Sequence, residues 1–370
     1  MFEPAHGIDL VGLLKAEFEM CKLKRGDLAA ILSGRTAPGM PGPWKYRDQY
    51  VDAAFKAFNE MGIKAFHVEL PPIPKPLLPL GPGALGVKGS AGLGVSALAG
   101  LAPALGALKN VDFVLDFAMT LFSPELAEMV AGGPKVLICC EPPEASLRLF
   151  PDHDLKRRLQ NAERRMAKGK TKTMLVSSAA GTAISMNLGQ YGTFIECGFA
   201  DDPGRWDAFP SGQVGCFADD GSGDGVFVID RGDQVVLPYM RYVESPVRLS
   251  VKQGYIREIT GGADAQLIKD HLESWNDPEV YALGHQSLGL HPNARWDAQS
   301  VYGWDSLGMD SRIFYGAYVL GTGANTLGNG TRNTPCHFDI CMRNLTVAID
   351  GEVLIDQGKV VAPDLRVEGR

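Results

Sequence analysis

The sequence lacks the short signatures of several large enzyme classes. Its 370 residues contain no GxxxxGKS/T phosphate-binding loop, no HExxH zinc-protease motif and no GxSxG serine-hydrolase motif. Residues 81–86 and 92–97 do match the glycine spacing of a dinucleotide site. Such a site needs a strand directly before the motif, whereas the proline-rich residues 71–76 precede the first match. We therefore interpret both stretches as glycine-rich loops.

Cysteine usage argues against two further kinds of site. The seven cysteines are odd in number and none are paired at CxxC spacing. This pattern disfavours both a disulfide framework and a thiolate zinc site. No basic segment followed by an apolar run is present near the N-terminus, so no secretory signal is expected. We expect a cytoplasmic protein with reduced thiols.

The chain also lacks an excess of positive charge. Its 36 Lys and Arg against 43 Asp and Glu give a net charge of −7, which offers no basic surface for nucleic acid or anionic lipid. Residues 89–108 are uncharged and long enough to cross a membrane, but they are rich in Gly and Ala and include Pro103. We expect a packed helix there, and a small molecule as the partner of the protein.

The first part of the chain alternates between helical and strand patterns. Continuous apolar strands separated by helices are typical of a parallel sheet covered on both faces. We predict an N-terminal α/β domain over residues 1–168. The expected strands are 27–32, 63–69, 111–116 and 135–139, and the expected helices are 8–21, 44–61, 95–108, 125–130 and 154–168.

From residue 169 onward the pattern changes to short strands and turns, which is typical of antiparallel pairing. One helical segment, 263–275, interrupts these strands. We therefore predict that residues 169–370 form a strand-rich, mixed α+β domain. The expected strands are 173–177, 193–197, 225–230, 234–238, 247–251 and 345–349.

Two hard polar residues stand two positions apart in an apolar, strand-like run near the C-terminus. Side chains alternate along a strand, so His337 and Asp339 would share one face while Phe338 would point the other way. Such a pair can supply two ligands to a metal ion. A hydrogen-bonded surface pair is the simpler alternative, because two ligands do not make a metal site.

A third ligand is available in the apolar, glycine-rich residues 281–289. His285 lies there, and burying an imidazole without a partner would be costly. With His337 and Asp339 it completes two histidines and one carboxylate, the arrangement that leaves open positions on ferrous iron. We expect His271, by contrast, to lie on the exposed face of its helix.

Several further motifs resemble the 2,5-dihydroxypyridine 5,6-dioxygenases, within a larger group that includes thermophilic-type metallo-aminopeptidases. The resemblance extends from about residue 12 to the C-terminus. It is carried by residues 141–144, 188–191, 202–207, 210–212, 279–285, 309–312, 314–316 and 334–340. The resemblance implies an N-terminal α/β domain and a C-terminal metal-binding domain. It also implies one Fe(II) per chain on the three residues named above, and an arginine, Arg312, near the substrate. We expect a homo-oligomer.

The sequence departs from both groups at informative positions. The aminopeptidases have a glutamate ligand where this chain has Gln213, and an amide is a poor substitute in a two-metal site. The resemblance places two proton-moving histidines of the dioxygenases at Phe122 and Ser185. Together with Leu121, these two residues are expected to line the substrate pocket, which suggests a ring other than 2,5-dihydroxypyridine.

We therefore predict an Fe(II)-dependent dioxygenase that opens a hydroxylated N-heteroaromatic ring with O₂. Arg312 could fix a substrate oxyanion, or could form an ordinary ion pair with Asp310 or Glu279. The alternatives are a single-metal amidase or peptidase and a metal-binding relative without activity. The candidates for the missing acid or base are Glu196, Tyr191 and His291.

Overall fold

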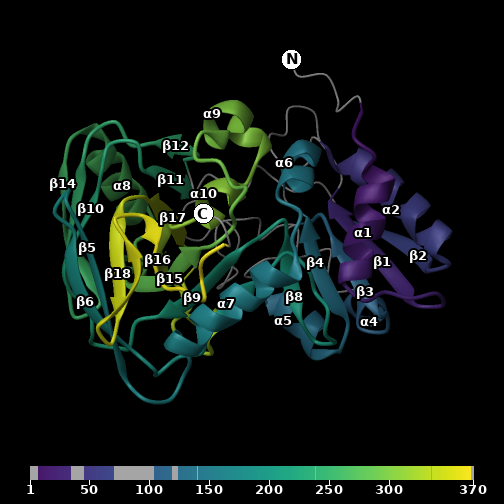
Figure 1. The fold of residues 1–370 in the computed structure, drawn as a ribbon, viewed down its shortest axis with the longest axis horizontal. Helices are drawn as coiled ribbons and strands as arrows, with labels where there is room; N and C mark the ends of the chain where they lie inside the picture. Colours follow the sequence, from purple (N-terminus) through teal and green to yellow (C-terminus); the bar gives the residue numbers. More distant parts are fainter. Residues whose placement is uncertain are drawn as a thin grey trace.

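The computed structural model describes most of the chain. The described residues are 7–34, 46–70, 104–118, 124–139, 141–237, 239–334 and 336–367. Figure 1 shows a parallel-sheet part at one end of the molecule and an antiparallel part at the other. The predicted fold class is confirmed, because the described residues form one parallel sheet followed by two antiparallel sheets.

The parallel sheet has the strand order β2-β1-β3-β4-β8. All residues of β3 and β4 are buried, as expected for strands covered on both faces. The long helices α1 and α2 pack against each other, with the Phe18 and Phe58 rings stacked at 4.3 Å. The strands are β1 (Leu28–Gly34), β2 (Lys64–Leu70), β3 (Phe113–Asp116) and β4 (Lys135–Cys139). The helices are α1 (Leu10–Met20), α2 (Arg47–Met61), α4 (Leu105–Leu108), α5 (Pro124–Ala131) and α6 (Pro143–Arg148).

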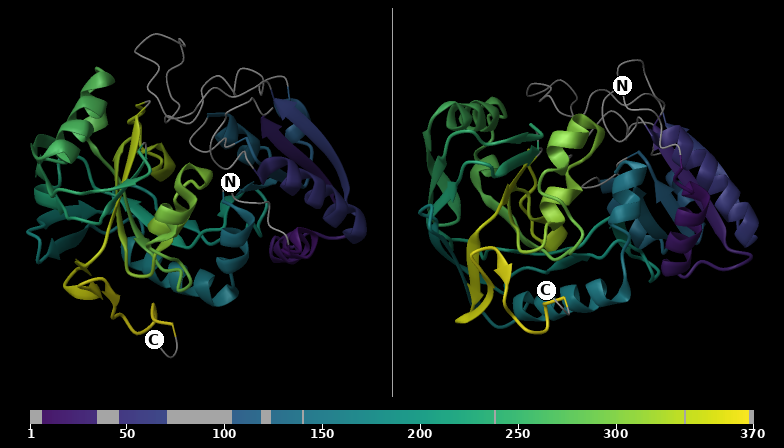
Figure 2. Two further views of the ribbon diagram at one scale, coloured as in Figure 1. Left: turned by 90° about the horizontal axis from the view of Figure 1, so that it is seen from above. Right: turned by 45° about the horizontal axis from the view of Figure 1, so that its top comes forward.

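The predicted domain boundary at residue 168 does not coincide with a division between the sheets. β8 (Trp206–Phe209) returns to the parallel sheet and pairs with β4. In the opposite sense, α7 (His153–Met166) packs against strands of the antiparallel part and runs between the two parts in Figure 2. A strand from beyond residue 168 thus completes the parallel sheet, and a helix from before residue 168 packs on the antiparallel part. Short local sequence patterns could not reveal this arrangement.

The antiparallel part consists of two packed sheets. The outer sheet has the order β14-β13-β10-β6-β5-β18-β19-β20, and the inner sheet has the order β12-β11-β17-β16-β15-β9-β7. The rings of Phe227 and Tyr318 meet between them at 5.9 Å. The outer strands are β5 (Lys172–Ser178), β6 (Ala183–Leu188), β10 (Asp224–Ile229), β13 (Val247–Lys252), β14 (Tyr255–Gly261), β18 (Leu345–Ile349), β19 (Glu352–Asp356) and β20 (Lys359–Val360). The inner strands are β7 (Phe194–Glu196), β9 (Gln213–Phe217), β11 (Gln234–Leu237), β12 (Arg241–Tyr242), β15 (Leu283–Gly289), β16 (Tyr318–Gly323) and β17 (His337–Met342).

Three helices accompany these sheets: α8 (Ala263–Ser274), α9 (Ala298–Tyr302) and α10 (Met309–Ile313). The prediction that His271 is exposed on α8 is wrong, because its side chain is buried against Phe338 and Trp275. Burial lowers the pKa of His271 to about 4. Among the residues that the structure describes, no helix is both long and apolar enough to span a membrane. The uncharged segment 89–108 lies mostly outside them, except for its last five residues.

Candidate metal centre

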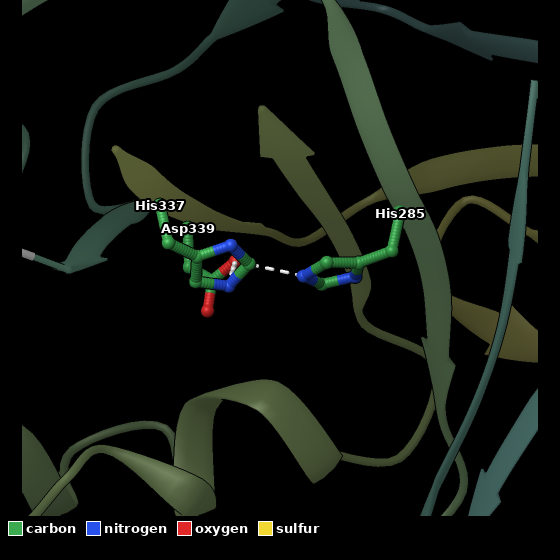
Figure 3. A group of neighbouring side chains, drawn as sticks. All are labelled: His285, His337 and Asp339. Atoms are coloured by element: carbon green, nitrogen blue, oxygen red, sulfur yellow. Dashed lines mark hydrogen bonds and ion pairs between the residues drawn. The ribbon is translucent and has the colours of Figure 1, made fainter. Parts of the chain in front are cut away.

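The three predicted metal ligands converge on one face of the inner sheet. His337 and Asp339 belong to β17, and His285 belongs to β15, with β16 lying between these two strands. Figure 3 shows the three side chains pointing toward one another from the two strands. Phe338 points to the opposite face, into the core between the sheets, as strand alternation requires.

A glycine on β16 allows side chains from two non-adjacent strands to meet. Gly321 lies directly opposite Asp339 in the β16–β17 register. A Cβ atom at this position would lie 2.5 Å from His285 Nε2. The His285 ring therefore occupies the space above the glycine, and any side chain there would displace it.

The donor atoms are close enough to share one ion. His285 Nε2 lies 2.9 Å, and His337 Nε2 lies 3.1 Å, from Asp339 Oδ1. The two imidazole rings are roughly parallel, with centroids 5.2 Å apart. Within the described part of the chain, these residues form the one group of three or more His, Cys, Asp or Glu donors gathered within 4.8 Å.

Neighbouring groups orient the two kinds of ligand. His285 Nδ1 lies 2.8 Å from Ser287 Oγ, which can accept a hydrogen bond from Nδ1–H and so direct the Nε2 lone pair toward the site. Arg312 Nε and Nη2 lie 3.0 and 2.9 Å from Asp339 Oδ2, which leaves Oδ1 facing the histidines. Burial alone would raise the pKa of Asp339, but the charges of His337, Arg312 and His285 hold it well below its usual range.

The partner of Arg312 differs from both predicted ion pairs. Asp310 is paired with Arg148 through two contacts of 2.7 Å, and the Glu279 carboxylate accepts a hydrogen bond from Tyr255. Arg312 contacts Asp339 on β17 instead. The alternative that Arg312 forms an ordinary ion pair with Asp310 or Glu279 is therefore wrong.

Glu196 lies at the edge of the same inner sheet, on β7. Its carboxylate accepts hydrogen bonds from Gln213 Nε2 at 2.8 Å and Ser211 Oγ at 3.1 Å. Burial raises the pKa of Glu196, and the two hydrogen bonds and the charge of Arg312 only partly offset this. A carboxyl group whose pKa is raised in this way holds its proton more readily than an exposed glutamate, as a general acid or base requires.

The other two acid or base candidates lie in different settings. Tyr191 lines a polar cavity of about 710 Å³ to which no triad residue contributes, and it donates a hydrogen bond to Asp220. Burial and this carboxylate raise the pKa of Tyr191 to about 12. Both ring nitrogens of His291 are engaged, one with the Leu149 carbonyl and the other with the Asn293 amide. His291 therefore has no ring nitrogen available for proton transfer in this structure.

One predicted pocket residue, Ser185, lies on a different sheet from the triad. It belongs to β6 of the outer sheet, and its side chain is exposed. Leu121 and Phe122 lie outside the described residues.

Two functional positions, Ser287 and Gly321, were missed in the sequence. Ser287 stands two residues after His285, so strand alternation places it on the same face. This spacing could have identified it once the segment was recognised as a strand. The role of Gly321 in making room for the His285 ring could not have been inferred, because it depends on which strand lies between the strands that bear the ligands.

The donor set fits a single divalent metal ion. Two imidazoles and one carboxylate are borderline and hard donors, and all three side chains are buried. The ionised carboxylate and the Ser287 contact to His285 supply the charge and the orientation that metal-binding residues need. Gln213 is hydrogen-bonded to Glu196 and adds no charge for a second ion.

The chain is similar to known proteins over most of its length. A family model described as 2,5-dihydroxypyridine 5,6-dioxygenase matches residues 9–362. The 2,5-dihydroxypyridine 5,6-dioxygenase of Pseudomonas putida is 38% identical over 315 residues, covering 85% of this chain and 87% of the relative.

Solved structures give a consistent result. The structure of 2,5-dihydroxypyridine dioxygenase from Pseudomonas putida KT2440 superposes with a TM-score of 0.85 at 34% identity, covering 96% of this chain and 98% of that one. Wild-type AmpT from Thermus thermophilus has a TM-score of 0.55 at 13% identity, with 96% and 99% coverage, and it shares the fold. From the family match and the extent of these similarities, the chain belongs to the 2,5-dihydroxypyridine 5,6-dioxygenase family.

Proposed function

We propose that the protein is a mononuclear Fe(II) dioxygenase that opens a hydroxylated N-heteroaromatic ring. The observation that carries this proposal is the convergence of His285, His337 and Asp339 on one buried point, in a chain of this family. Two histidines and one carboxylate leave open positions on ferrous iron for a substrate oxygen and O₂. When bound, Fe(II) would supply the activation of O₂ toward the ring.

The protein side chains would hold and orient the reactants. His285 and His337 would present neutral Nε2 atoms, and Asp339 would present the oxygen that already faces both rings. Arg312 would keep Asp339 ionised and fixed. Arg312 directs one N–H of Nη1 to the Leu307 carbonyl and uses Nε and Nη2 on Asp339. One N–H on each terminal nitrogen would then remain for a substrate oxyanion.

Glu196 is the acid or base that the geometry supports best. It is buried on the same sheet as the triad, and its pKa is raised and sensitive to the charge of Arg312. We propose that Glu196 exchanges a proton with the substrate or with a water molecule beside it. Tyr191 and His291 have weaker support, because one lines a separate cavity and the other is occupied by backbone groups.

The identity of the ring is the finer part of the proposal. Phe122 stands where the family resemblance implies a histidine, and phenylalanine cannot move a proton. We propose that 2,5-dihydroxypyridine itself is a poor substrate and that a bulkier or substituted ring is preferred. A kcat/KM of ~10⁴ M⁻¹s⁻¹ or more for 2,5-dihydroxypyridine would contradict this part alone.

The test is anaerobic reconstitution with Fe(II), followed by measurement of O₂ uptake with dihydroxypyridines, hydroxypicolinates and aminophenols. We expect one metal ion per chain and O₂ consumption matched to ring loss. Turnover of an amide or peptide at equal rates with and without O₂ would instead establish the hydrolase alternative. Light scattering of the same sample tests the further proposal that the protein is a homo-oligomer.

A further inference from the structure

The N-terminal part of the chain reaches the helix that bears Arg312. Glu141 directly precedes the Pro-Pro pair that begins α6, and its side chain is buried. Its Oε1 atom accepts hydrogen bonds from the backbone N–H groups of Leu307 and Met309, each at 3.0 Å. These two residues begin the turn into α10, so one carboxylate holds the start of this helix.

A second contact links the other end of α6 to the same helix. Arg148, the last residue of α6, forms a bidentate pair with Asp310, in which Nη1 lies 2.7 Å from Oδ1 and Nη2 lies 2.7 Å from Oδ2. Asp310 is 1% exposed and also accepts the backbone N–H of Arg295. Bidentate arginine–carboxylate pairs fix geometry as well as contributing energy. The segment 141–148 therefore contacts α10 and the turn before it at two points, through Glu141 and through Arg148.

The contacts of segment 141–148 with α10 extend to the metal centre through Arg312. Leu307 donates its backbone N–H to Glu141, and its carbonyl oxygen accepts a hydrogen bond from Arg312 Nη1. The Nε and Nη2 atoms of the same guanidinium contact Asp339 Oδ2. A continuous path of polar contacts thus joins Glu141, in the N-terminal part, to a metal ligand on β17.

We propose that Glu141 and Arg148 are positioning residues, which set the pose of the Arg312 guanidinium toward Asp339 and toward the substrate. This inference rests on the proposed function for its catalytic readout. Placement of the N-terminal part and the geometry of the site would then be coupled through α10, although neither positioning residue touches a metal ligand.

The chemistry of Glu141 supports a role beyond packing. Burial raises its pKa to about 7, against the hydrogen bonds from Ser306 and Met309. The charged groups that face it are Asp310, which raises its pKa, and Arg312, which lowers it. An apolar residue would fill this space without that cost, and buried groups with strongly shifted pKa values gather at functional sites.

The test compares Glu141→Gln and Arg148→Met with Glu144→Gln. Glu144 is the matched control, because it lies in the same segment and is only partly buried. In the metal-free protein with isotope-labelled arginine, the Nε–H resonance of Arg312 is assigned by its loss in Arg312→Lys. We expect this resonance to shift in Glu141→Gln and in Arg148→Met, and to stay in place in Glu144→Gln.

The catalytic readout uses, with saturating Fe(II), whichever ring the wild-type protein opens in the O₂-uptake screen of dihydroxypyridines, hydroxypicolinates and aminophenols. Loss of binding that is equal in the ground and transition states raises KM and leaves kcat unchanged. We expect KM to rise about tenfold in both positioning variants, with kcat within about threefold of wild type. Arg148→Lys, which keeps one of the two contacts to Asp310, should recover part of the loss.

The two readouts separate the possible failures. An Arg312 resonance unmoved in both variants, or a KM unchanged while stability falls, would show that the contacts only tie the two parts together. Absence of ring opening by the wild-type protein would remove the proposed function, and the resonance would still decide the positioning role. Should Glu141→Gln fail to fold, Arg148→Lys and Asp310→Asn test the positioning role through the Arg148–Asp310 ion pair instead.

Discussion

The two antiparallel sheets of this protein differ in how their faces are covered. In the outer sheet, β6 alternates strictly between exposed and buried residues. In the inner sheet, every residue of β9, β15, β16 and β17 is buried, polar ones included. The outer sheet covers one face of the inner sheet, and the other face packs against α10 and the N-terminal part.

This difference explains why the metal centre lies where it does. A polar side chain on the outer face of β6 meets water and needs no protein partner. On the inner sheet an imidazole or carboxylate must be partnered, because leaving it unpaired costs about 1–3 kcal/mol or more. His285, His337 and Asp339 are therefore held against one another and against Ser287 and Arg312, in the kind of fixed arrangement that a metal site requires.

The largest effect should come from removing a predicted ligand on the inner sheet. His337→Ala and Asp339→Asn should each reduce metal binding and O₂ uptake to background, because the first leaves two donors and the second replaces the charged carboxylate with a weak, neutral amide oxygen. Asparagine keeps the shape that Arg312 contacts, so the fold should persist by circular dichroism. Metal analysis that shows one ion per chain in either variant would contradict the assignment of the triad.

Gly321→Ala should have the next largest effect, because the new methyl group would occupy the space of the His285 ring. We expect a loss of about 1–3 kcal/mol in the free energy of unfolding and weakened metal binding. The same substitution at Gly106, where a Cβ meets nothing within 4 Å, is the matched control. Wild-type metal affinity in Gly321→Ala would mean that this close approach does not limit the site.

Ser287→Ala tests the contact that orients His285. Loss of such a partner typically lowers metal affinity by ~10–100-fold, and we expect an effect in this range by competition with a chelator. Ser185→Ala, on the exposed face of the outer sheet, should leave both affinity and turnover unchanged. A comparable loss in both variants would break the contrast between the two sheets.

The smallest effect concerns the pH dependence of stability. Because burial raises the pKa of Glu196 in the folded protein, the folded state binds more protons than the unfolded state. Glu196 therefore destabilises the protein as pH rises from the unfolded pKa through the folded one. Glu196→Gln should remove this loss as the pH rises above the unfolded Glu pKa of about 4, whereas Glu258→Gln on exposed β14 should not. Parallel stability curves for wild type and Glu196→Gln would contradict the shift.

Local patterns predicted the regular elements unevenly. The strands β1 to β4 and the helices α1, α2 and α7 were expected close to their observed bounds, because their apolar periodicity is strong. The strand β15, which bears His285, was not recognised, because its glycines and polar residues break any alternation. The buried position of His271 was also missed, since the packing partner of α8 lies far away in the sequence.

The sequence by itself determined which donors are present and that His337 and Asp339 share a face, because the strand period of two is a local property. Tertiary structure decided the rest. Only strand order places His285 across β16 from this pair, and only the side chain missing at Gly321 lets the rings approach. Likewise, Arg312 faces Asp339, rather than the neighbouring Asp310, because Arg148 holds Asp310 and Glu141 holds the turn before α10. The contacts of Arg148 with Asp310 and of Glu141 with Leu307 join residues more than a hundred positions apart, so no local pattern encodes them.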